Sequence, residues 1–403
     1  MKYSTLSSLL ASVFLVIILS ACSKPSPDTV SPVLEAAPVV GPVSEEEAKP
    51  ASPADIDLSK KSPKMISAFN FFKDPAKQIP NDGVIPYALN NQHFADYASV
   101  RRFFWVPEGE QIKYSAEGIL EMPMGTIILQ TFSFADESVE GGERLIETRL
   151  IMNSGDIDGW TFTVYKWNAE MTDAKRAVAG GLVQVKDVKD PTATEPLNYL
   201  IPNASECSRC HENNEGYRNP IGINARNLSL EVDGKNQLAL WAEKGILNAA
   251  PKSYHSAVVW DDPASGTIEK RSREWLDANC AHCHNPNGPA SVSGLDLSIT
   301  QTNPMSIGMY KPPVAAGLGS EGFKFSIDPG SAGTSFIINR LQSDNPAVMM
   351  PPLGRLRENE EAVQLISEWI NSIEFSEEEA QDLMGEQKKR AQQLLESGAV
   401  VDQ

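Results

Sequence analysis

Cys280-Ala281-His282-Cys283-His284 is the stretch that organises this sequence of 403 residues. Two cysteines stand three positions apart, and a histidine directly follows the second cysteine. On a helix, positions i and i+3 lie on the same side, so both thiols can reach one edge of a flat cofactor. The CxxCH pattern is the attachment motif of a c-type haem. Cys280 and Cys283 are therefore predicted to bind haem covalently, and His284 to bind its iron.

A second copy of the motif, Cys207-Ser208-Arg209-Cys210-His211, predicts a second haem held by Cys207, Cys210 and His211. Structural zinc sites usually pair two CxxC motifs about 15–20 residues apart, much closer together than these two. A thioredoxin-like motif does not require the histidine, and iron–sulfur ligation favours clustered cysteines. The sequence thus predicts two covalently bound c-type haems.

The net charge indicates which kinds of partner the protein can bind. The formal net charge is −18, which argues against nucleic-acid binding because such proteins normally carry a basic surface. An acidic surface suits soluble or membrane-associated redox proteins with basic docking patches, since complementary charge speeds encounter. A role in solubility alone is the alternative explanation of the acidity.

Residues 1–22 have the pattern of an export signal. A nearly continuous apolar run over residues 9–19 is too short to span a bilayer. It ends at Leu19-Ser20-Ala21-Cys22, which resembles the lipobox of bacterial lipoproteins, and the resemblance implies that Cys22 is lipidated. A conventional signal peptide with an incidental cysteine is the alternative. We expect a lipid anchor on the periplasmic side of the bacterial cell envelope, with the outer membrane favoured because serine, not aspartate, follows Cys22.

The composition divides the remaining chain into five segments. Residues 23–64 are rich in Pro, Ala, Ser and Glu, which predicts a disordered tether. In residues 65–202, short segments with the composition of strands recur at regular spacing, which predicts an all-β sandwich or barrel-like domain. Residues 203–265 and 266–375 carry the motifs and predict a first haem c unit and a second haem c domain. Residues 376–403 predict a charged helix. The expected fold class is multidomain, a β-domain followed by mainly α, cytochrome c-like haem domains.

Individual elements follow from local patterns. Enrichment in β-branched and aromatic residues predicts strands over residues 103–106, 126–134, 145–152 and 160–167. Helices are predicted over residues 236–244, 271–283 and 360–373. The last helix has an apolar stripe, and Asn359 is suited to cap its beginning.

The axial ligand opposite each motif histidine sets the reduction potential, and methionine there raises it relative to a second imidazole. The candidates for the second haem are Met305, Met309, Met349 and Met350. Met350 is preferred because it begins a proline-stiffened loop before the helix predicted over residues 360–373. Met349 is the nearest rival.

The first haem has no obvious sixth ligand. No methionine lies between His211 and Cys280, and His255 is the only histidine in that interval. Ligation by His255 would give a bis-histidine, low-potential centre; a surface role is the alternative. His93, Met122 and Met124 are further candidates without a specific pattern behind them. An open iron would bind peroxide or small gases.

Further stretches share a family likeness: YALN at residues 87–90, FADYA at 94–98, MGT at 124–126, ETRL at 147–150, GW at 159–160, NCAHCHNPNGPA at 279–290, MP at 350–351 and LISEWI at 365–370. Together they resemble an uncharacterised family of exported bacterial di-haem c-type cytochromes, over nearly all of residues 80–373. The resemblance implies a lipoprotein whose last unit has a class I cytochrome c fold, with His284 and Met350 as axial ligands. It implies no settled biochemical role, and His93 departs from the small or polar residue expected there.

The two motifs predict an envelope-anchored di-haem cytochrome that transfers electrons between periplasmic redox partners. One alternative is a di-haem peroxidase or haem-linked oxidoreductase with an open or low-potential first haem. Another is a β-domain binding module that uses the haems as its electron outlet. Electron transfer is favoured over substrate conversion, so no catalytic residue is assigned.

Overall fold

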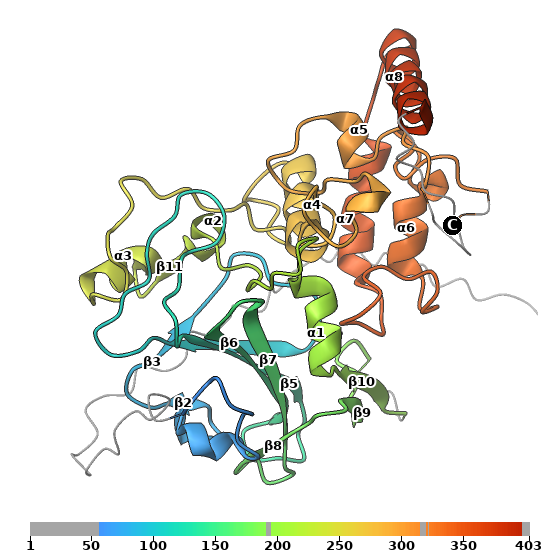
Figure 1. The fold of residues 1–403 in the computed structure, drawn as a ribbon. Helices are drawn as coiled ribbons and strands as arrows, with labels where there is room; N and C mark the ends of the chain where they lie inside the picture. Colours follow the sequence, from blue (N-terminus) through green and yellow to red (C-terminus); the bar gives the residue numbers. More distant parts are fainter. Residues whose placement is uncertain (1–55, 191–194, 315–319, 321, 397–403) are drawn as a thin grey trace, which may run out of the picture. The chain divides into compact units, whose positions relative to one another are not determined.

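The computed structural model describes residues 56–190, 195–314, 320 and 322–396 (Figure 1). The signal peptide, Cys22 and the tether up to residue 55 lie outside the described residues. The described residues belong to one compact unit. Within them, no helix has both the length and the apolar character needed to cross a membrane.

A six-stranded antiparallel sheet is the largest element, and its strands follow chain order from β3 to β8. Its strands are β3 (Val84–Tyr87), β4 (Ser99–Trp105), β5 (Ile127–Ala135), β6 (Glu143–Asp156), β7 (Gly159–Trp167) and β8 (Ala174–Arg176). Two-stranded ribbons pair β1 (Phe72–Asp74) with β2 (Ile79–Pro80), β9 (Gly181–Val185) with β10 (Leu197–Ile201), and β11 (Glu231–Val232) with β12 (Lys235–Asn236). The four predicted strands are confirmed in β4 to β7.

The sheet is open, with β3 and β8 at its edges, so the sandwich or barrel expected for residues 65–202 is corrected to a single sheet with small ribbons. Both faces are nevertheless buried. Phe103 and Trp105 pack on one face with the short turn η2 (Ile66–Phe69). Phe104 packs on the opposite face with Trp241, because successive strand residues point to opposite sides. The segment that follows the first motif, which includes Trp241, therefore covers this second face of the sheet. In a sandwich, another sheet would occupy that place.

The helices are α1 (Ala204–His211), α2 (Ala225–Leu228), α3 (Gln237–Glu243), α4 (Ile268–Leu276), α5 (Pro304–Ile307), α6 (Phe336–Gln342), α7 (Glu360–Asn371) and α8 (Glu377–Glu396). Short turns are η3 (Asp277–Ala281), η4 (Ser291–Ser293) and η5 (Ala332–Thr334). The three helices predicted within residues 236–373 are confirmed, the second as α4 continued by the π-turn η3. The Asn359 side chain accepts a hydrogen bond from the backbone N–H of Ala362 at 3.0 Å, so the predicted cap of α7 is confirmed.

A separate apolar core joins α4, α6 and α7. Trp275 and Leu276 of α4 pack with Leu341 of α6 and with Ile366 and Trp369 of α7. Burial of side chains of this size stabilises the fold by roughly 1.5–3 kcal/mol each. This core supports the end of α4, from which the second motif begins.

Candidate functional site

The first motif lies on α1, a helix with a well-defined beginning. Asn203 and Glu206 form a capping box, in which each side chain accepts a hydrogen bond from the other residue's backbone N–H. The helix packs against β7. The cap and this contact together fix the direction in which Cys207 and Cys210 project.

His211 is oriented as an iron ligand requires. Its Nδ1 lies 2.7 Å from the carbonyl oxygen of Asn219, so a protonated Nδ1 donates to that oxygen and leaves Nε2 free for a metal. The ring of Phe162 packs beside it, with 4.8 Å between the ring centroids. Burial lowers the pKa of His211 to about 4, which keeps the imidazole in the neutral form that binds metals.

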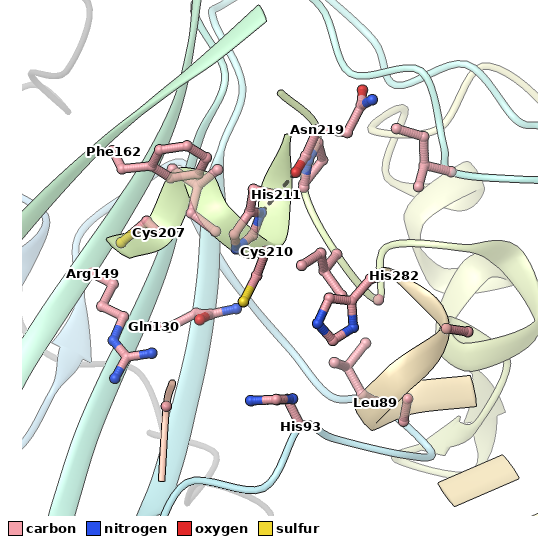
Figure 2. A pocket seen from close by; sticks show the side chains of 18 of the residues that line it. Leu89, His93, Gln130, Arg149, Phe162, Cys207, Cys210, His211, Asn219 and His282 are labelled. Carbon is pink, nitrogen blue, oxygen red and sulfur yellow. Dashed lines mark hydrogen bonds between the residues drawn. The ribbon is translucent and has the colours of Figure 1, made fainter. Parts of the chain in front are cut away.

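A cavity of about 530 Å³ opens in front of this motif (Figure 2). Cys207, Cys210 and His211 line it together with Arg149 and Phe162 of the sheet. Its volume lies in the range of roughly 300–1,000 Å³ that is typical of cofactor and ligand pockets. Cys207, Cys210 and His211 all line this one cavity, so the residues present fit a covalently attached haem.

The cavity wall carries charged side chains of both signs, three arginines and four carboxylates: Arg102, Arg149, Arg226, Glu206, Glu212, Glu274 and Asp277. Arg149 donates to the fully buried Glu147 at 2.7 Å and to the Tyr199 hydroxyl at 3.1 Å. Burial lowers the pKa of Arg102, and its Nε has no hydrogen-bond partner among the described residues. A guanidinium N–H without a partner suits a cofactor that carries carboxylates, as haem does.

The second motif follows α4 through the turn η3. The His284 backbone N–H donates to the Cys280 carbonyl at 2.8 Å, which keeps the motif in a helical turn. The His284 imidazole places Nδ1 3.0 Å from the Ser293 hydroxyl oxygen. Burial, helped by the charges of His282 and Arg340, lowers the pKa of His284 to about 4. Both motif histidines are thus neutral imidazoles with Nδ1 engaged.

The Met350 loop is fixed close to this motif. The Met350 N–H donates to the Arg340 carbonyl at 2.9 Å, and the Arg355 guanidinium donates to the Met350 carbonyl. Met350 and Asn279, the residue before Cys280, line a small cavity of about 10 Å³. The loop that carries the predicted ligand therefore lies beside the residue that precedes the second motif.

The other sequence candidates lie in different places. Three of the candidate methionines are buried: Met305, Met309 and Met349. Met122 packs in the same core as Phe104 and Trp241, on one face of the sheet, and Met124 is 69 % exposed. His255 is exposed, and its Nε2 lies 3.1 Å from the Ser253 hydroxyl. The described residues that line the large cavity do not include His255, so the structure does not bring it to His211.

Two other histidines do line the large cavity: His93 and His282 (Figure 2). Their ring centroids are 5.8 Å apart. His282 stands at one of the two positions of the CxxCH motif that can be any residue. Nothing in the sequence except this place in the motif indicates that it lies in the site. His93 lies far away in the sequence, and the strand patterns give no indication of its position.

The two motifs meet at this cavity. The sulfurs of Cys210 and Cys283 and a ring nitrogen of His282 all lie within 4.8 Å of one another. The hydrogen bond between the two thiols lowers the pKa of Cys210 and raises that of Cys283. Asn214 strengthens the junction, because its backbone N–H donates to the Asn287 carbonyl at 2.9 Å.

The comparisons with known proteins give no neighbour for this chain. No protein-family model, curated protein or solved structure matches it. The candidate site is thus defined by its own residues and their geometry.

Proposed function

We propose that this chain is an envelope-anchored di-haem c-type cytochrome that passes electrons between periplasmic redox partners. The observation that carries the proposal is the meeting of the two motifs, with the Cys210 and Cys283 sulfurs within 4.8 Å. Each sulfur would bind the edge of its own haem, so the two edges would adjoin. Adjacent edges favour direct passage of an electron from one centre to the other, because such transfer weakens steeply with distance.

Each haem would supply one-electron exchange between ferrous and ferric iron, while the chain supplies ligands, orientation and burial. His211 and His284 are the proposed proximal ligands, and Met350 the second axial ligand of the second haem. The packing of α4, α6 and α7 around Trp275 supports a class I cytochrome c fold for residues 266–375. The two CxxCH motifs, each with an oriented neutral histidine, support covalent haem at both sites.

The partners are proposed to be redox proteins with basic docking patches, since the chain carries a net charge of −18. Attachment to the membrane would be through lipid on Cys22. Electron transfer to such a partner should slow as salt is raised, because salt screens the attraction between exposed charges.

The test is to produce the full chain in a host that attaches c-type haems. We expect two haems per chain that stay bound after denaturation, detected by intact mass and by the absorption of the reduced protein. A variant with Cys207→Ala and Cys210→Ala should keep only the second haem, and one with Cys280→Ala and Cys283→Ala only the first. Purified protein that contained zinc and no haem would refute the proposal, because Cys210, His282 and Cys283 are also suitable zinc ligands.

A further inference from the structure

We propose that His93, in the loop between β3 and β4, is the sixth ligand of the first haem and binds its iron opposite His211. The inference rests on the proposed function, because it needs a haem attached to Cys207 and Cys210. It replaces His255, the histidine favoured by sequence proximity, with a residue that precedes the motif by more than a hundred positions.

The loop that carries His93 is held on both sides of the histidine. The Asn91 N–H donates to the Asn227 side chain at 2.8 Å, and the Asn91 side chain donates to the Val258 carbonyl at 2.8 Å. The Phe94 N–H donates to the Asn279 side chain at 2.8 Å. Because the fold already fixes this backbone, little conformational entropy is lost when the side chain binds a metal.

Asp96 ties the same loop to the chain that follows Met350. Its carboxylate accepts hydrogen bonds from the backbone N–H groups of Leu356 and Arg357, at 2.8 and 2.9 Å. Gly354 passes close to the histidine: a Cβ atom at this glycine would lie 3.3 Å from His93 Nε2. The glycine, with its φ of +86°, therefore leaves room for the imidazole beside the Met350 loop.

The imidazole of His93 faces the same cavity as His211 (Figure 2). Its Nδ1 is buried and has no hydrogen-bond partner among the residues that the structure describes. Buried polar groups nearly always have such a partner, since an unpaired one costs about 1–3 kcal/mol. A fixed imidazole with an unpaired nitrogen, in the cavity of a proximal histidine, is the arrangement that a second axial ligand requires.

His282 is the rival, because it lines the cavity and its Nδ1 is also buried without a partner in the described part of the chain. One of its ring nitrogens, however, lies within 4.8 Å of both the Cys210 and the Cys283 sulfur. Cys210 would bond to a substituent at the edge of the porphyrin. A nitrogen beside that sulfur lies near the edge, whereas an axial ligand lies over the centre, so the geometry favours His93.

With this assignment, the two haems would differ in potential, which sets the direction of electron transfer between them. Two imidazole ligands leave a haem at a lower potential than histidine plus methionine. With His93 on the first haem and Met350 on the second, electrons would enter at the first haem and leave from the second.

The test uses the haem-loaded full chain and the variant His93→Gly. In the wild-type protein we expect both ferric haems to be low-spin by electron paramagnetic resonance. In the variant, half of the haem should become high-spin, and the reduced protein should bind one carbon monoxide per chain. Added imidazole should restore the low-spin spectrum. The matched variants His282→Gly and His255→Gly should keep both haems low-spin.

An unchanged spin state in His93→Gly, one high-spin haem already present in the wild type, or a high-spin haem produced by His282→Gly would each overturn the assignment. If His93→Gly does not fold, His93→Met serves instead. It should keep the first haem low-spin and raise its potential, and an unchanged potential would refute the ligation. A chain that carries no haem contradicts the proposed function itself, so the two failures are distinguishable.

Discussion

The Nδ1 atom of His284 lies 3.0 Å from the hydroxyl oxygen of Ser293, at the end of the short turn η4. The Ser293 hydroxyl also accepts a hydrogen bond from the Leu295 N–H at 3.2 Å, which holds it in place. The corresponding nitrogen of His211 meets a backbone carbonyl, that of Asn219. The two motifs thus fix their histidines in the same way with different acceptors, and only the acceptor at the second motif can be removed by mutation.

Replacement of Ser293 by alanine should raise the potential of the second haem. The acceptor at Nδ1 makes the imidazole a stronger donor to iron and favours the ferric state. If the ferric state alone loses a hydrogen bond worth about 1 kcal/mol, the potential rises by about 40 mV for one electron. A redox titration followed by absorption measures the shift. Ser298→Ala, whose hydroxyl bonds to Asp296, is the control and should leave the potential unchanged.

Replacement of Met350 by leucine should remove the sulfur–iron absorption band of the second haem and lower its potential. Leucine cannot bind iron, and axial ligands set haem potentials over a span of roughly 0.8 V. The matched control is Met349→Leu, because Met349 is buried next to it in the sequence. The control should keep the band and lose less than about 1.5 kcal/mol of stability. Loss of the band in the control alone would assign the ligand to Met349.

Replacement of Glu147 by alanine should lower the free energy of unfolding by about 3–5 kcal/mol, because it leaves Arg149 without its buried counter-charge. Tyr199→Phe removes only the hydroxyl that donates to Glu147 at 2.6 Å, and should cost about 1–3 kcal/mol. Urea unfolding of the haem-loaded chain measures both changes. As control, Glu121→Ala breaks an exposed pair with Lys113 and should cost at most about 1 kcal/mol. Equal losses in all three variants would contradict this account.

Asp136 should contribute stability that acid removes. Hydrogen bonds from Ser138 and Arg144 lower the pKa of Asp136 below its usual range. A carboxyl whose pKa is lower in the folded state stabilises the fold above its unfolded pKa of about 3.9, and loses that effect as the pH falls through the folded pKa. Asp136→Asn should therefore be less stable than wild type at pH 7, with a gap that narrows below about pH 4. Urea midpoints measured from pH 7 to pH 2.5 check this, and a gap independent of pH would contradict it.

Several strands and helices could be predicted from the types of residue in short stretches of the sequence. The strands at residues 126–134 and 160–167 follow from β-branched and aromatic enrichment, and α7 follows from its cap at Asn359 and its apolar stripe. The sandwich was wrong for a physical reason. The period of a strand shows which face is apolar, but not whether a sheet or a helical segment covers it, and here Trp241 of α3 packs on Phe104.

The sequence alone determined the two CxxCH motifs, because the proposed haem attachment and ligation need residues only one helical turn apart. It also singled out Met350, through the stiffness of its own loop. Only the tertiary structure decided that Cys210 meets Cys283 and that His93, not His255, lines the same cavity as His211. Contacts between such distant residues depend on how the loop between β3 and β4 packs against later parts of the chain. Hydrogen bonds that Asn91 and Phe94 donate and that Asp96 accepts fix this packing.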